Sequence, residues 1–197
     1  MKKRKLIGLL TAVPESLHAK RILEGVARQC EKYDYDVVVF ASMVHFGFGH
    51  KEFAAGEENI YEAVNFDLLD GVIVDCISFV EDGDDRVKNH IEEKLKKECK
   101  KPVVSLSMPL SDYEVISDDD EPVFRQIVDH ILNVHKLSDI YFLTGHKGYS
   151  IAEERVGLFK KIMGEHGLTV SDDRIFYGDF WYSGGAAIAD KILSGEV

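Results

Sequence analysis

The sequence predicts an α/β fold in which a parallel sheet is flanked by helices on both faces. Short apolar runs such as Leu6–Leu10 and Val37–Phe40 have the length of strands that are buried on both faces. They alternate with longer segments in which apolar residues recur every three or four positions, the spacing of one helical face. Strands that alternate with helices in this way form a Rossmann-like parallel sheet, because parallel neighbours need crossover connections.

The first half of the chain predicts four strands joined by three helices. Pro14 suits the start of the first helix, Asp70-Gly71 marks the turn before the third strand, and Pro102 ends the third helix. The aromatic and glycine-containing segment 42–56 is expected to be a loop. The expected strands are 6–10, 37–40, 72–77 and 103–106, and the expected helices are 14–33, 57–66 and 85–99.

An irregular stretch, residues 109–120, is the best candidate for a domain boundary, so we expect lobes at 1–110 and 111–197. It contains a short extended piece at Val115-Ile116, and Gly167 suits the cap of a later helix. In the second lobe the expected helices are 122–135, 153–166 and 184–193, and the expected strands are 140–143 and 175–177.

Composition narrows the classes of function. The chain has 24 Lys and Arg against 35 Asp and Glu, a net charge of −11, which argues against nucleic-acid binding by these residues. No apolar run approaches the ~20 residues of a membrane span. Cys30, Cys76 and Cys99 are far apart, so we expect reduced, mostly buried thiols in a cytoplasmic protein.

The first residues allow a second interpretation. The basic segment Lys2–Lys5 followed by apolar Leu6–Val13 is similar to the start of a signal peptide, which an exported solute-binding protein would need. The residues before Lys20 offer no small-x-small cleavage site. We therefore favour a buried first strand.

Several segments carry a resemblance to a known family. Leu69–Val74 has an Asp-Gly turn leading into an apolar strand, Glu154–Phe159 contains Arg-x-Gly-x-Phe, and Gly178–Phe180 reads Gly-Asp-Phe with Gly185 beyond it. In this order and spacing they resemble the ligand-sensing region of lac-repressor and galactose-repressor type (LacI/GalR) regulators. The resemblance implies the periplasmic-binding-protein-like type I fold, with one complete lobe and a second lobe cut short at its carboxyl end.

The resemblance also implies the kind of site. Effectors of this family bind in a cleft between two lobes, and the arginine that corresponds to Arg155 contacts the effector. Phe180 stands at the family's aromatic stacking position, with Trp181 beside it. The alternatives are an Arg155 paired with Glu153 or Glu154, and aromatic residues that only fill a core.

Three more candidates follow from the predicted sheet. His18 comes shortly after the first strand, Asp75 closes the third and Ser107 follows the fourth. Ligands of parallel α/β sheets bind beyond the carboxyl ends of strands, so these side chains are candidate ligand contacts. The alternatives are a solvent-facing His18 in the first turns of a helix, and Asp75 and Ser107 as polar residues that only close a strand.

Two other segments give weaker indications of a functional site. His45 and His50 could bind a metal, but a site needs three or four ligands, and we expect a loop without metal. We expect Asp118–Glu121 to cap a helix. No nucleophile–base arrangement or phosphate-binding glycine loop is present, so we expect no enzyme and no cofactor.

The sequence therefore predicts a cytoplasmic sensor domain that binds a small polar effector, sugar- or nucleoside-like, and forms a homodimer. No helix-turn-helix precedes the first strand, so the attached output could be DNA-binding or a signalling domain such as a diguanylate cyclase. The alternatives are a ligand-free dimerisation module, whose surface would be Leu17–Cys30, and an exported solute-binding protein.

Overall fold

The computed structural model describes residues 4–44, 51–80, 85–180 and 182–196. The chain divides into two compact units, Met1–Asp118 and Asp119–Val197. The division falls later than the expected position after residue 110. The reason is that the extended piece around Val115 pairs with the fourth strand and so belongs to the first unit.

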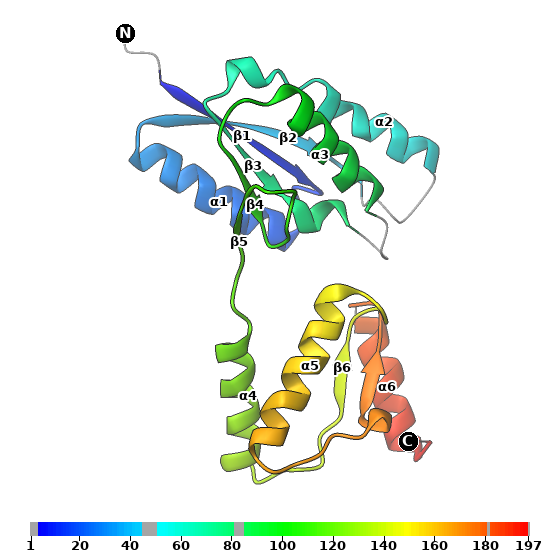
Figure 1. Cartoon of the computed structure of the whole chain (residues 1–197). Coiled ribbons are helices and arrows are strands. Elements are labelled where there is room, and N and C mark those ends of the chain that lie inside the picture. Colours follow the sequence, from blue (N-terminus) through cyan, green and yellow to red (C-terminus); the bar gives the residue numbers. More distant parts are fainter. Residues whose placement is uncertain (1–3, 45–50, 81–84, 181, 197) are drawn as a thin grey trace. The chain divides into compact units, whose positions relative to one another are not determined.

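The first unit is built on a five-stranded sheet with the order β2-β1-β3-β4-β5 (Figure 1). All four pairings are parallel, which confirms the predicted class. The strands are β1 (Lys5–Ala12), β2 (Tyr35–Ser42), β3 (Gly71–Asp75), β4 (Val103–Leu106) and β5 (Glu114–Ile116).

Three helices cover this sheet: α1 (Leu17–Lys32) on one face, and α2 (Lys51–Glu62) and α3 (Arg86–Glu98) on the other (Figure 1). This distribution follows from right-handed crossovers, because the chain moves outward from β1 to β2 and then back past β1 to β3 and β4. Ser16 caps α1 by accepting a hydrogen bond from the Ala19 amide at 3.1 Å.

The second helix differs from the prediction at both ends. It begins at Lys51, inside the expected loop, and stops at Glu62. Phe66 lies instead in a short 3-10 turn, Phe66–Leu68, because the Asn65 side chain accepts a hydrogen bond from the Asp67 amide at 3.1 Å and starts a new turn there.

The main core lies between the sheet and the α2–α3 face. Tyr61 and Phe79 meet edge to face there, with ring centroids 5.1 Å apart. Apolar residues of β1, β3 and β4 that point to this face are buried with them, among them Leu10, Val72, Val74 and Val103. The opposite face carries α1 and, beside it, an apolar groove.

The second unit has a smaller, two-stranded parallel sheet of β6 (Phe142–Thr144) and β7 (Ile175–Tyr177). Its helices are α4 (Glu121–Asn133), α5 (Ser150–Glu165) and α6 (Tyr182–Ser194). Phe142 stacks on Phe159 with ring centroids 4.7 Å apart, and Val128, Ile162 and Met163 complete the buried cluster. Beside this cluster, Lys161 of α5 pairs with Glu121 of α4 at 2.7 Å.

Two findings bear on the expected compartment. All three cysteines lie in the described part of the chain and are free thiols; Cys30 and Cys76 are buried and Cys99 is half-buried. Across the described residues, every helix is too short or too polar to traverse a lipid bilayer.

Candidate functional site

Three of the candidate residues gather at the carboxyl edge of the first sheet. Asp75 is the last residue of β3, Ser107 directly follows β4, and His18 lies in the first turn of α1, which follows β1. The His18 Nε2 atom lies 3.1 Å from the Asp75 Oδ1 atom, and His18 and Ser107 line the same cavity. The expectation drawn from strand ends therefore describes a real cluster, and ligand binding there stays a prediction.

Asp75 is fully buried and yet well satisfied. The Thr11 hydroxyl donates to its Oδ2 atom at 2.8 Å, while His18 contacts its other oxygen. A buried carboxylate is costly unless it is hydrogen-bonded and paired, so Asp75 fixes the positions of Thr11 and His18. The pKa of His18 is raised above 6.5, chiefly by the hydrogen bond to Asp75, against desolvation, with a smaller contribution from the charge of Asp118.

The cavity beside this cluster has a volume of about 640 Å³. Ser107 lines this cavity and has a left-handed backbone conformation, with φ at 67°. Its amide donates a hydrogen bond to the Ile116 carbonyl at 2.8 Å. Sequence reasoning missed Arg21 and Asp118, although Arg21 follows His18 by one helical turn. The lining residues are Leu17, His18, Arg21, Ile22, Leu106, Ser107, Ile116 and Asp118.

A buried tyrosine holds the strand ends that carry this cluster. The Tyr61 hydroxyl donates to the Thr11 carbonyl at 2.6 Å and accepts from the Ser42 amide at 3.0 Å. Burial raises the pKa of Tyr61 to about 12, so the hydroxyl keeps its proton and its donor role. Tyr61 thereby ties the end of β1 to the end of β2.

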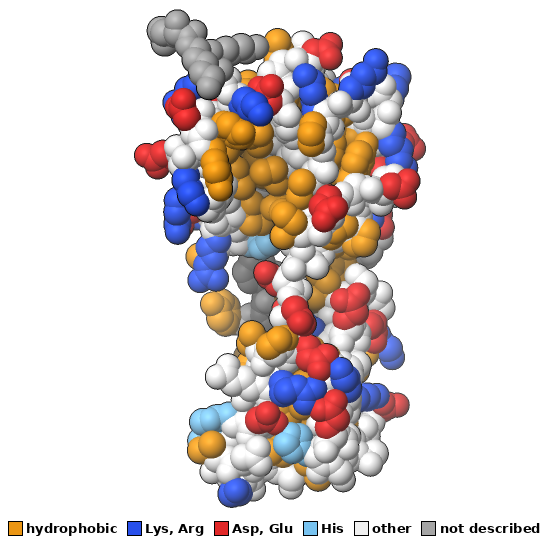
Figure 2. Space-filling view, turned by 60° about the vertical axis from the view of Figure 1, so that its left-hand side comes forward, with side chains coloured by type: hydrophobic (Ala, Val, Ile, Leu, Met, Phe, Trp, Pro, Cys, Tyr) orange, Lys and Arg blue, Asp and Glu red, His pale blue; other side chains and the backbone are white. Residues whose placement is uncertain are grey.

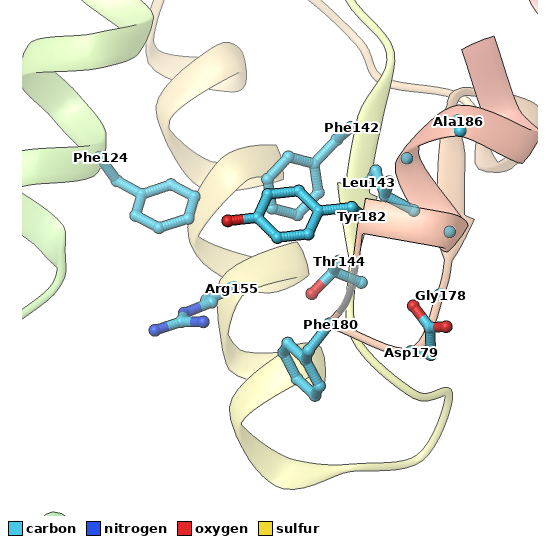
Figure 3. Close-up of a pocket in the computed structure, with 12 residues that line it drawn as sticks. Phe124, Phe142, Leu143, Thr144, Arg155, Gly178, Asp179, Phe180, Tyr182 and Ala186 are labelled. Atoms are coloured by element: carbon cyan, nitrogen blue, oxygen red, sulfur yellow. The ribbon is translucent and has the colours of Figure 1, made fainter. Parts of the chain in front are cut away.

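The other candidates belong to the second unit, where Arg155 of α5 and Phe180, between β7 and α6, line one cavity of about 650 Å³ (Figure 3). Trp181 lies outside the described residues. Tyr182 is 93 % exposed and also lines this cavity. Its remaining walls are Phe124, Phe142, Leu143, Thr144, Gly178, Asp179, Gly184, Gly185 and Ala186.

Arg155 pairs with neither of the glutamates considered from the sequence. Its Nε atom donates to Asp120 Oδ2 at 3.0 Å, whereas Glu153 accepts from the Gly148 amide and the Tyr177 hydroxyl. Among the described residues, this bond from Nε is the one side-chain hydrogen bond that Arg155 makes. Asp120 thus orients the guanidinium and leaves its paired donors for another group.

The same contact refines the expected capping role of the acidic run. Asp119 does cap the first turn of α4, because its side chain accepts from the Glu121 amide at 3.0 Å. Asp120, the residue just before the helix, makes no capping hydrogen bond and turns to Arg155 instead.

Phe180 lies over a glycine. A Cβ atom at Gly145 would come within 1.7 Å of the Phe180 ring, so the ring rests directly on the Gly145 backbone. It meets His146 and Tyr149 edge to face, each at 6.0 Å between ring centroids. Half of the side chain remains exposed, which a residue that only fills a core would not show.

The part of the chain that the structure describes brings no three His, Cys, Asp or Glu side chains together in a way that could hold a metal. The loop with His45 and His50 lies outside that part.

Comparisons with known proteins agree with this architecture. No family model matches the chain. The HTH-type transcriptional repressor PurR of Vibrio cholerae is 23 % identical over 188 residues, which cover 95 % of this chain and 52 % of the repressor. PurR of Vibrio vulnificus is 24 % identical over 191 residues, again 95 % of this chain and 52 % of the repressor.

Solved structures match over nearly the whole chain. The lac repressor dimer bound to operator and the anti-inducer ONPF has a TM-score of 0.69 at 16 % identity, covering 98 % of this chain and 62 % of that one. The transcription regulator CcpA of Lactococcus lactis has a TM-score of 0.68 at 18 % identity, covering 98 % and 65 %. CcpA of Weissella paramesenteroides with bound sucrose has a TM-score of 0.65 at 17 % identity, covering 97 % and 64 %.

These matches define the class of the fold: the chain has the periplasmic-binding-protein-like type I fold of the LacI-family ligand-binding domain. The resemblance seen in the sequence is thereby confirmed at the level of the fold. The named relatives are transcription regulators, in agreement with the expectation that this region is not an enzyme. The chain spans about half the length of the curated relatives it matches.

Proposed function

We propose that this chain is the effector-binding domain of a LacI-type regulator and that its effector is a small polar molecule such as a sugar or a nucleoside. The observation that carries the proposal is that Arg155 and the half-exposed Phe180 line the same cavity of the second unit. Arg155 uses its Nε atom for Asp120, so its Nη donors are available to a ligand. A planar fork of donors suits a pair of hydroxyls or a planar polar group, and an aromatic face suits a sugar or a base.

The comparisons support the same class of effector. The W. paramesenteroides regulator has been solved with bound sucrose and with bound glucose. For the present chain we propose sugars as one class of ligand, without naming a particular sugar. Ligand binding at the His18 and Ser107 cluster of the first unit stays a prediction from the ends of the strands.

A screen of thermal unfolding tests the proposal. The full chain would be mixed with a panel of neutral sugars and nucleosides, and a ligand that binds only the folded state raises the unfolding temperature. We expect at least one compound to stabilise the chain, and we expect Arg155→Lys to lose that effect because lysine cannot replace the paired donors. Lys191→Gln, on α6 away from the cavity, is the control and should behave as the wild type.

A second candidate function, dimerisation without a ligand, is favoured by one surface. A groove of about 560 Å³ lies between α1 and the uncovered part of the first sheet. Val26 and Cys30 of α1 line it together with Ile73 of β3 and Val104 of β4, and Figure 2 shows hydrophobic side chains gathered on one face of this unit. Within our proposal this groove is the homodimer surface, and the lac repressor to which the chain is similar was solved as a dimer.

The compartment and the output belong to the proposal as well. Three free thiols support a reducing, cytoplasmic location. The relatives are repressors, which supports DNA control as the output, and a signalling domain is the alternative.

A further inference from the structure

The cavity of the second unit has a second exposed aromatic side chain in addition to Phe180. Tyr182, the first residue of α6, lines the cavity and is nearly fully exposed. Figure 3 shows its ring extending from the start of α6, with the hydroxyl end towards the side of Phe124 and Arg155. An aromatic ring that lines a cavity with its surface uncovered offers a large apolar area to a ligand.

Phe180 differs from Tyr182 in being held in place. Its backbone has a left-handed conformation, with φ at 62°, which is strained for a bulky residue and persists only where surrounding contacts impose it. Here the ring rests on the Gly145 backbone and meets His146 and Tyr149 edge to face. Phe180 is therefore a wall that is fixed before a ligand arrives, which lowers the entropic cost of binding.

The described walls of this cavity offer few polar side chains to a ligand. The hydroxyl of Thr144 donates to a backbone carbonyl at 3.3 Å, and Asp179 accepts a hydrogen bond from the Ser183 hydroxyl at 2.8 Å. Beside the hydroxyl of Tyr182, the side-chain donors that these walls leave for a ligand are the Nη groups of Arg155. The cavity is thus rich in aromatic surface and poor in hydrogen-bonding groups.

This balance distinguishes between the two classes of effector. A sugar ring carries hydroxyl groups around its whole edge, and each hydroxyl that is buried without a partner costs free energy. A nucleobase has its polar atoms on one edge and two flat faces that stack on aromatic side chains. Two aromatic walls and one arginine suit the flat base better than they suit the sugar.

We propose that Tyr182 is a specificity-determining residue of this cavity, which together with Phe180 selects a nucleoside over a free sugar. The inference rests on the proposed function, which allows both classes of effector. Phe180 supplies the fixed wall, and the exposed ring of Tyr182 turns about its side-chain torsions onto the base. The Nη donors of Arg155 are available to acceptor atoms on the edge of the base.

The test is calorimetric titration of the full chain with ligands that differ by the base alone. Adenosine, guanosine, cytidine and uridine are compared with ribose, the sugar that all four contain, and with glucose. We expect at least one nucleoside to bind, and ribose and glucose to bind more weakly by about tenfold or more, the contribution of one stacked base.

Variants of Tyr182 test its part in this preference. Tyr182→Ala should weaken binding of the nucleoside by about tenfold and leave the weak binding of ribose unchanged. Tyr182→Phe keeps the ring and should restore most of the affinity. Leu193→Ala is the matched control, because Leu193 is also an exposed apolar residue of α6 and does not line the cavity. Both positions are exposed, so all variants should unfold at the temperature of the wild type.

Each contrary result has a definite meaning. Equal nucleoside affinity in Tyr182→Ala and wild type, or a Tyr182→Phe variant as weak as Tyr182→Ala, would refute the aromatic wall. Binding of glucose or ribose as tight as that of the nucleosides removes the selection and leaves the proposed function standing. No binding of any nucleoside or sugar removes both.

Discussion

Among single residues, those that build the candidate site of the first unit include buried polar groups that are fully paired. Asp75 has no exposed surface, and its two oxygens are occupied by Thr11 and His18. The sequence placed Asp75 and His18 at one sheet edge through the rule for strand ends. It did not reveal Thr11 as a partner, because a contact between side chains 64 positions apart leaves no local pattern.

The hydroxyl of Tyr61 gives a prediction for a single side chain. Tyr61→Phe removes the hydroxyl that donates to the Thr11 carbonyl and accepts from the Ser42 amide, and both of these residues are buried. We expect the free energy of unfolding to fall by about 1–3 kcal/mol, the usual cost of a buried polar group left unsatisfied. Urea denaturation measures it, with Tyr33→Phe as the exposed control. An unchanged midpoint would contradict the role given to Tyr61.

For helices and strands, regular segments were predictable and their ends were less so. The strands Val103–Leu106 and Ile175–Tyr177 have the predicted bounds, because turn or helix-ending residues flank each apolar run. The start of α2 was missed, because glycine and aromatic residues in 42–56 suggested a loop. Arg155 and Phe180 came from the resemblance, and their partners Asp120 and Gly145 became visible only in the fold.

The contact between Phe180 and Gly145 gives a prediction for the segments that follow β6 and β7. Gly145→Ala would place a methyl group in the space of the Phe180 ring, so the ring must swing away from its position on the cavity wall. The moving atoms are the end of a half-exposed side chain, so stability should change by less than about 1 kcal/mol. Affinity for any effector found in the screen should fall, as titration calorimetry would show.

Gly164→Ala is the matched control for that variant. Gly164 lies inside α5 with open space around its Cβ position, so alanine should leave binding unchanged and stabilise the helix by up to about 1 kcal/mol. If Gly145→Ala bound the effector as well as Gly164→Ala, Phe180 would not be a wall of the site.

For the molecule as a whole, the groove beside α1 is the feature that concerns association. Val26→Lys would place a charge in this apolar surface, whereas Glu24→Lys changes charge on the same helix outside the groove. We expect a dimer for the wild type and for Glu24→Lys, and a monomer for Val26→Lys, in sedimentation velocity. Thermal unfolding of each variant checks that it is folded, and a monomeric wild type would rule out the dimer surface.

Binding of a small polar effector through Arg155 is the central claim about the function of this chain. It can be measured by titration calorimetry with the best compound of the screen, on wild type, Arg155→Lys and Lys191→Gln. We predict saturable binding by wild type and Lys191→Gln, and at least a tenfold weaker affinity for Arg155→Lys, about 1.4 kcal/mol. Equal affinity in all three proteins, or no compound that binds the wild type, would show that Arg155 does not hold an effector.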